Sequence, residues 1–66
     1  MEILLNGEPH DVADDKTLAQ LLDDHGYTQR RVAVEINQEI VPRSRHAQTR
    51  LNPHDRIEIV QAMGGG

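Results

Sequence analysis

The chain has 66 residues with a formal net charge of −4, so it forms one domain with a small core and repels nucleic acid on average. It contains no cysteine, which excludes disulfides, thiolate nucleophiles and Cys-ligated zinc, and favours a reducing, cytoplasmic setting. The N-terminal residues lack the pattern of a signal peptide, and no stretch approaches the roughly 20 apolar residues of a membrane span.

The N-terminal segment predicts a β-hairpin. Residues 2–6 alternate as a strand, with Leu4 on the face opposite the core residues. Asn6-Gly7 is typical of a type I′ turn, which needs positive φ at both central positions. The returning strand is expected over residues 8–13, at a sheet edge because Pro9 cannot donate to a ladder.

A short helix of about eight to ten residues is predicted next. Thr17 and Gln20 have the spacing of a capping box, in which each side chain satisfies an orphan backbone N–H. Gly26 stands where a left-handed C-terminal cap belongs. The predicted apolar stripe of this helix is Leu18, Leu21, Leu22 and His25.

The second half of the chain predicts three more strands. Residues 32–36 alternate with β-branched side chains, and Asn37-Gln38 turns the chain into a short strand over 39–41, which Pro42 ends. Residues 43–50 are polar and irregular, with room for one helical turn.

Leu51 is expected to be buried before a turn at residues 52–55, and the last strand follows over residues 56–61. This order predicts an α+β fold of the β-grasp (ubiquitin-like) type: a mixed sheet of about four to five strands with one main helix across one face. Residues 1–63 form the predicted domain and residues 64–66 a flexible tail. The predicted core is Ile3, Leu5, Val12, Leu18, Leu21, Leu22, Val34, Ile36, Ile40, Leu51, Ile57 and Ile59.

The side chains offer no recognisable catalytic constellation. The histidines lack metal-ligand spacing and are interpreted as solvated or half-buried, so no metal site is predicted. Ser44 lacks the context of a nucleophile, and Asp14-Asp15 and Asp23-Asp24 are interpreted as solvated charges around the helix. The four histidines are His10, His25, His46 and His54.

The remaining feature is the glycine tail, Gly64-Gly65-Gly66. A frayed end without function is one interpretation. The other is a carrier terminus, because a chain without Cβ atoms can enter a narrow slot in another protein. The Gly66 carboxylate is ionised at neutral pH and a poor electrophile, but adenylation by ATP would convert it into a mixed anhydride that a sulfur or nitrogen nucleophile could attack.

The whole chain resembles the ThiS family of sulfur carriers in thiamin biosynthesis. The similarity rests on the chain length, the strand order and the diglycine end, together with four segments. These segments are residues 34–43 (VEINQEIVPR), Asn6-Gly7, residues 17–22 (TLAQLL) and residues 55–60 (DRIEIV).

This resemblance implies a carrier and not an enzyme. A ThiF-like adenylating enzyme would activate the Gly66 carboxylate with Mg-ATP, so the carrier itself binds no cofactor. A cysteine desulfurase or rhodanese-type donor would supply sulfur to form a thiocarboxylate, and a ThiG-like thiazole synthase would accept it. Gly65 and Gly66 match the family's end, and Gly64 is assigned as a spacer.

A docking surface is predicted on the helix-free face of the sheet. Leu4 and Val60 share the parity of that face, and on neighbouring strands they would form an exposed apolar patch leading to Met63. The alternative is that they are single apolar surface residues, which are common.

Three other functions stay open. A carrier of the same fold could serve molybdopterin or another sulfur pathway with the same tail chemistry. A ubiquitin-like modifier would join lysines through Gly66. A plain interaction module would keep its function without the tail.

Overall fold

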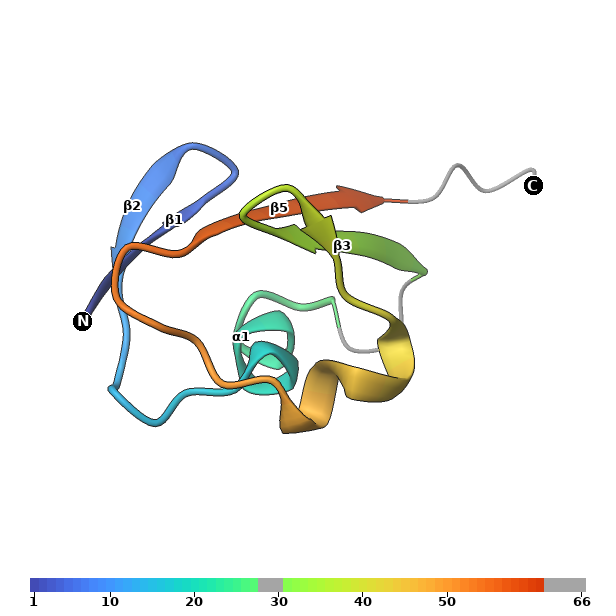
Figure 1. Cartoon of the computed structure of the whole chain (residues 1–66), viewed down its shortest axis with the longest axis horizontal. Helices are drawn as coiled ribbons and strands as arrows, with labels where there is room; N and C mark the ends of the chain where they lie inside the picture. The colour runs from blue at the N-terminus through green and yellow to red at the C-terminus, as the bar shows by residue number, and fades with distance from the viewer. Residues whose placement is uncertain (28–30, 62–66) are drawn as a thin grey trace.

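A five-stranded mixed sheet organises the chain, in the order β2-β1-β5-β3-β4 (Figure 1). The computed structural model describes residues 1–27 and 31–61, with the backbone alone at residue 61. β1 and β5 pair in parallel, and the other pairs are antiparallel. The strands are β1 Glu2–Leu5, β2 Glu8–Asp11, β3 Val32–Ile36, β4 Glu39–Ile40 and β5 Arg56–Gln61.

Helix α1 (Leu18–Asp24) and the 3-10 helix η1 (Arg43–Gln48) lie on the same side of this sheet (Figure 1). The other side carries no helix in the described part of the chain. This arrangement confirms the predicted β-grasp architecture, with five strands. The helix-covered side is called the inner face below, and the opposite side the outer face.

The first hairpin forms at the predicted turn. Asn6 and Gly7 have φ of 50° and 85°, as a type I′ turn requires. β2 is an edge strand, as Pro9 indicates, but it ends at Asp11, two residues before the predicted end.

The capping box at the start of α1 is present. The Gln20 N–H donates to Thr17 Oγ1 over 3.2 Å, and the Thr17 N–H donates to Gln20 Oε1 over 2.9 Å. The helix has seven residues, fewer than predicted, and Gly26 follows it with φ of 81°. Placing His25 in the apolar stripe was wrong, because His25 is the exposed C-cap residue, beyond the last helical turn.

The core is aliphatic and lies between the inner face and the helices. Nine of the predicted core residues are buried, while Val12 and Ile36 are partly buried and pack against them. Ile40 is 72% exposed, which contradicts its predicted place in the core. It pairs with Glu35 on the outer face, and the next residue, Val41, packs against the core instead. The nine are Ile3, Leu5, Leu18, Leu21, Leu22, Val34, Leu51, Ile57 and Ile59.

Two polar side chains are buried that the sequence patterns did not single out. His46, on η1, is 8% exposed, so its interpretation as solvated or half-buried was wrong; its Nε2 donates to the carbonyl of Val41 over 3.0 Å. Asp55 is 7% exposed and accepts hydrogen bonds from the backbone N–H of Asn52 and the side-chain amide of Asn37. Both side chains form hydrogen bonds with backbone or loop groups, as buried polar groups generally do.

Candidate functional site

The last described residue, Gln61, ends the central strand of the sheet. The predicted tail Gly64-Gly65-Gly66 and the predicted docking residue Met63 lie outside the described residues, as does the domain boundary placed between residues 63 and 64. Covalent geometry still limits the reach of the tail. Five residues beyond Gln61, fully extended, span at most about 18 Å. Any protein that encloses the Gly66 carboxylate must therefore approach the end of β5.

β5 is firmly held at the point where it leads to the tail. It pairs with β3 in a register that runs from Ile57 opposite Ile36 to Gln61 opposite Val32. Ile57 is fully buried and Ile59 is 8% exposed. Burying two such side chains contributes roughly 1.5–3 kcal/mol each. The packing of the domain therefore fixes the position of β5.

The structure places both described docking residues on the outer face. Leu4 is half-buried and Val60 is 61% exposed, and their strands are neighbours as predicted. The register separates them, however: Leu4 pairs with Arg56, four residues before Val60. That offset is about 13 Å along the strand. Leu4 and Val60 therefore do not form one continuous patch, because Glu58 lies between them on the same face.

Apolar and acidic groups alternate around Val60. Its partner across the strands is the exposed Ala33, and the next pair along is Glu35 opposite Glu58. Like charges directly opposite each other destabilise a sheet, and neither carboxylate forms an ion pair with a described residue. Ile40, beside Glu35, completes the row. This face therefore suits a partner surface with apolar and basic groups.

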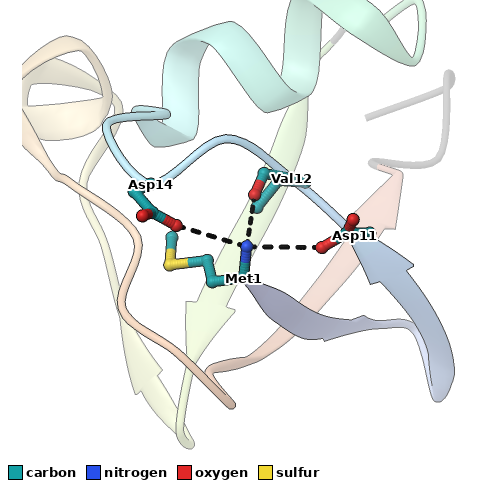
Figure 2. Close-up of polar contacts among 4 residues, drawn as sticks. All are labelled: Met1, Asp11, Val12 and Asp14. Carbon is teal, nitrogen blue, oxygen red and sulfur yellow. Dashed lines mark hydrogen bonds and ion pairs between the residues drawn. The ribbon is translucent and has the colours of Figure 1, made fainter.

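A second cluster of charge surrounds the N-terminus, at the end of the sheet opposite to the end of β5 (Figure 1 and Figure 2). The Met1 ammonium donates to the Val12 carbonyl over 2.7 Å and forms ion pairs of 3.3 Å with Asp11 and Asp14. The hydrogen bond to Asp11 is the main cause that raises the pKa of this ammonium above its ordinary 8.0. The cluster anchors β1 and the end of β2.

The histidines do not assemble into a metal site within residues 1–27 and 31–61, where no group of three or more metal-ligating side chains occurs. His10 and His25 are brought together, with ring centroids 5.2 Å apart in an edge-to-face contact. His46 lines a cleft of about 190 Å³ between α1, β3 and η1. That volume is below the usual range for small-molecule sites. No helix of the described chain is long and apolar enough to cross a bilayer.

Comparison with known proteins gives consistent matches over the whole chain. A sequence model of the ThiS family matches residues 3–66. The sulfur carrier protein ThiS of Escherichia coli K12 is 36% identical over 66 residues, which cover both chains completely. The crystal structure of the thiamine biosynthesis protein ThiS from Geobacter metallireducens matches with a TM-score of 0.85 and 32% identity, again over all of both chains.

Longer relatives also match. The thiazole synthase of Paramagnetospirillum magneticum is 44% identical over 66 residues, and that of Magnetococcus marinus is 42% identical over the same length. The chain spans 20% of the length of each of these two proteins. A segment similar to the whole of this chain is therefore part of a larger polypeptide in those organisms.

Proposed function

Because the chain belongs to the ThiS family, we propose that it is a sulfur carrier for thiazole formation in thiamin biosynthesis. The carrying group is the carboxylate of Gly66. The observation that carries the proposal is the match over the full length of both chains to a protein named as a sulfur carrier. The firmly paired β5, which leads into the tail, supports it.

The chemistry proceeds in three substitutions. A carboxylate oxygen of Gly66 attacks the α-phosphorus of ATP, and pyrophosphate leaves. The acyl-adenylate that forms is a mixed anhydride, and a sulfur nucleophile attacks its carbonyl carbon while AMP leaves. When the nucleophile is the outer sulfur of a donor persulfide, the product is an acyl disulfide. A thiol then attacks the donor's own sulfur and forms a disulfide with it, and the Gly66 thiocarboxylate leaves. Activation is necessary because a terminal carboxylate, with an ordinary pKa of about 3.5, is an anion at neutral pH.

This chain supplies the reacting group, and its partners supply the catalytic groups and the sulfur. The carrier supplies a reacting end without side chains, and a ThiF-like enzyme supplies ATP, Mg²⁺ and the groups that stabilise charge. The final two residues, Gly65 and Gly66, enter the catalytic slot, where a Cβ would meet its walls. Gly64 acts as a spacer. A cysteine desulfurase or rhodanese-type protein supplies the sulfur.

Thiazole synthase is the proposed acceptor of that sulfur. The support is that two proteins named thiazole synthase contain a segment similar to this whole chain. Carrying both parts in one polypeptide raises their effective concentration to each other, which is useful for partners that react together. For this chain, the carrier domain and a ThiG-like enzyme would instead meet as two separate molecules.

Docking takes place through Val60 and Leu4 on the outer face, together with Met63. The distance of each residue from Gly66 determines how close it can lie to the enclosing enzyme. Val60 lies six residues before Gly66, so about 22 Å of extended chain at most separates them. Leu4 lies about 13 Å farther back along the sheet. We therefore assign the close contact to Val60 and Met63, and to Leu4 a place at the rim.

Complementation tests this proposal. A bacterial strain that lacks its own ThiS-type carrier, and therefore needs added thiazole, is supplied with this chain. The full chain should restore growth without thiazole, while a version lacking Gly65 and Gly66 should not. Gly64→Ala is the matched control and should restore growth, because a spacer tolerates a methyl group. Growth with the truncated chain would refute a role for the terminal carboxylate.

The related functions leave different products. A molybdopterin-type carrier would restore molybdoenzyme activity and leave the thiazole requirement in place. A protein modifier would leave isopeptide links between Gly66 and lysines, visible in tryptic peptides. The matches to thiamine biosynthesis proteins favour the thiamin pathway.

A further inference from the structure

Among the described residues, the central strand β5 has an unpaired edge at its C-terminal end. On one side it pairs with β3 through Gln61. On the other side its pairing with β1 stops early, at Leu5 opposite Ile57. The β1 chain then turns away at Asn6-Gly7. No described residue lies opposite the last part of β5 on this side.

Along a strand, the backbone N–H and C=O groups of successive residues point to opposite sides, which shows which groups lie on this edge. The N–H groups of Leu4 and Asn6 donate to the carbonyls of Asp55 and Ile57, so odd-numbered β5 residues face β1. The Asn37 N–H donates to the Arg56 carbonyl, so even-numbered residues face β3. The exposed edge therefore consists of the Ile59 carbonyl and the N–H and carbonyl of Gln61.

Asn6 ends the β1–β5 ladder with its side chain. Asn6 Oδ1 accepts the Ile59 N–H over 2.8 Å, in the place that a β1 carbonyl would take if the strand continued. The last donor before the gap is thus satisfied, and the groups beyond it point outward along the path that β1 has left. A row of free N–H and C=O groups is a template for another strand.

The length of the remaining chain identifies what can occupy this edge. An enzyme that surrounds the Gly66 carboxylate lies within about 18 Å of Gln61, which leaves room for little other than its own polypeptide beside β5. A second copy of this chain is disfavoured, because both copies would bring Glu58 and a net charge of −4 to the contact.

We propose that the enzyme that activates the carboxylate adds an extended segment of its own backbone to β5 at Ile59–Gln61. This inference rests on the proposed carrier function and deepens it. The partner segment accepts the Gln61 N–H and donates to the Ile59 carbonyl, and so continues the sheet past the end of β1. Recognition by main chain fixes the direction in which the tail enters the slot, whatever side chains the tail carries.

The test compares backbone N–H groups that differ by one position. A chain of 66 residues can be assembled by chemical ligation, so the amide N–H of Gln61 can be replaced by an ester oxygen. The matched control has the ester at Val60, whose N–H faces β3. Gln61→Pro removes the same N–H genetically, and Gln61→Ala retains it. For each version, urea unfolding and the dissociation constant for a ThiF-like adenylating enzyme are measured.

The Gln61 ester should unfold like the natural chain but bind the enzyme about five- to tenfold more weakly, as expected for one main-chain hydrogen bond. Gln61→Pro should follow it, and Gln61→Ala should bind normally. The Val60 ester should instead lower the urea midpoint. Normal binding by the Gln61 ester would overturn the proposal. Failure of the natural chain itself to undergo ATP-dependent adenylation would instead refute the carrier function.

Discussion

Asp55 connects two loops that would otherwise be independent. One carboxylate oxygen accepts the Asn52 N–H over 2.8 Å, and the other accepts the Asn37 side-chain amide over 3.0 Å. Asn37 Oδ1 in turn accepts the Arg56 N–H. The β3–β4 turn is thereby tied to the loop that feeds β5. A single buried carboxylate thus helps to position the strand that leads to the tail.

Replacing Asp55 with alanine should therefore destabilise the domain. Two donors lose their acceptor, one of them a part-buried backbone N–H, and we expect a loss of about 1–3 kcal/mol in the free energy of unfolding. Urea denaturation measures it. Asp15→Ala, at an exposed position, is the control and should change the value by less than about 0.5 kcal/mol. Equal stability of both variants would show that water replaces the carboxylate.

The N-terminal ammonium predicts a dependence of stability on pH. Its pKa is raised in the folded chain, mainly by the hydrogen bond to Asp11. A raised pKa means that the stabilisation is complete below the unfolded value of about 8 and is lost as pH rises through the folded value. For the chain beginning at Met1, unfolding free energy should therefore fall between pH 7 and pH 10.

Acetylation of the N-terminus isolates this effect from other titrations. The acetylated chain should be less stable than the free amine at pH 7 and should approach it at pH 10. Asp11→Asn should reduce the difference. A constant difference between the acetylated and free chains across this range would contradict the role of the ammonium.

At the scale of elements, α1 depends on its cap because it has only seven residues. Thr17→Ala removes one half of the capping box and should cost about 1 kcal/mol. In a domain of this size that corresponds to a fall of about 4–8 °C in melting temperature. Thr17→Ser, which keeps the hydroxyl, should retain most of the stability. Calorimetry on both variants checks this, and identical melting points would refute the contribution of the cap.

Local signals predicted most elements. The Asn6-Gly7 turn, the capping box and Gly26 each depend on a few adjacent residues, and all three are confirmed. Ile40 was misplaced because a two-residue strand after a turn gives no alternation to read, and a shift of one residue exchanges the faces. The burial of His46 and Asp55 depends on partners that fold back from other segments.

In the candidate site, too, local sequence patterns could not predict contacts between distant segments. Alternation predicted correctly that Leu4 and Val60 share a face. The offset between β1 and β5 is a long-range property, set by how the chain packs through the core, and it moves Leu4 away from Val60. Sequence patterns could thus assign the face but not the distance between its residues.

At the scale of the whole molecule, the proposed function requires a partner to approach the end of β5. Val60→Asp should therefore weaken adenylation strongly, by about tenfold or more, because it places a charge in the proposed contact. Leu4→Asp, about 13 Å back, should have a smaller effect. Pyrophosphate exchange with the activating enzyme measures both. Equal losses, or none in a folded Val60→Asp variant, would contradict the assignment.

The most direct test of the account is the intact mass of the protein after incubation with ATP, the activating enzyme and a sulfur source. The account predicts replacement of one oxygen by sulfur, located on Gly66 by fragmentation, with no change in a chain that lacks Gly65 and Gly66. An unchanged mass in a reaction that converts the Escherichia coli carrier, or a chain joined to lysines instead, would contradict it.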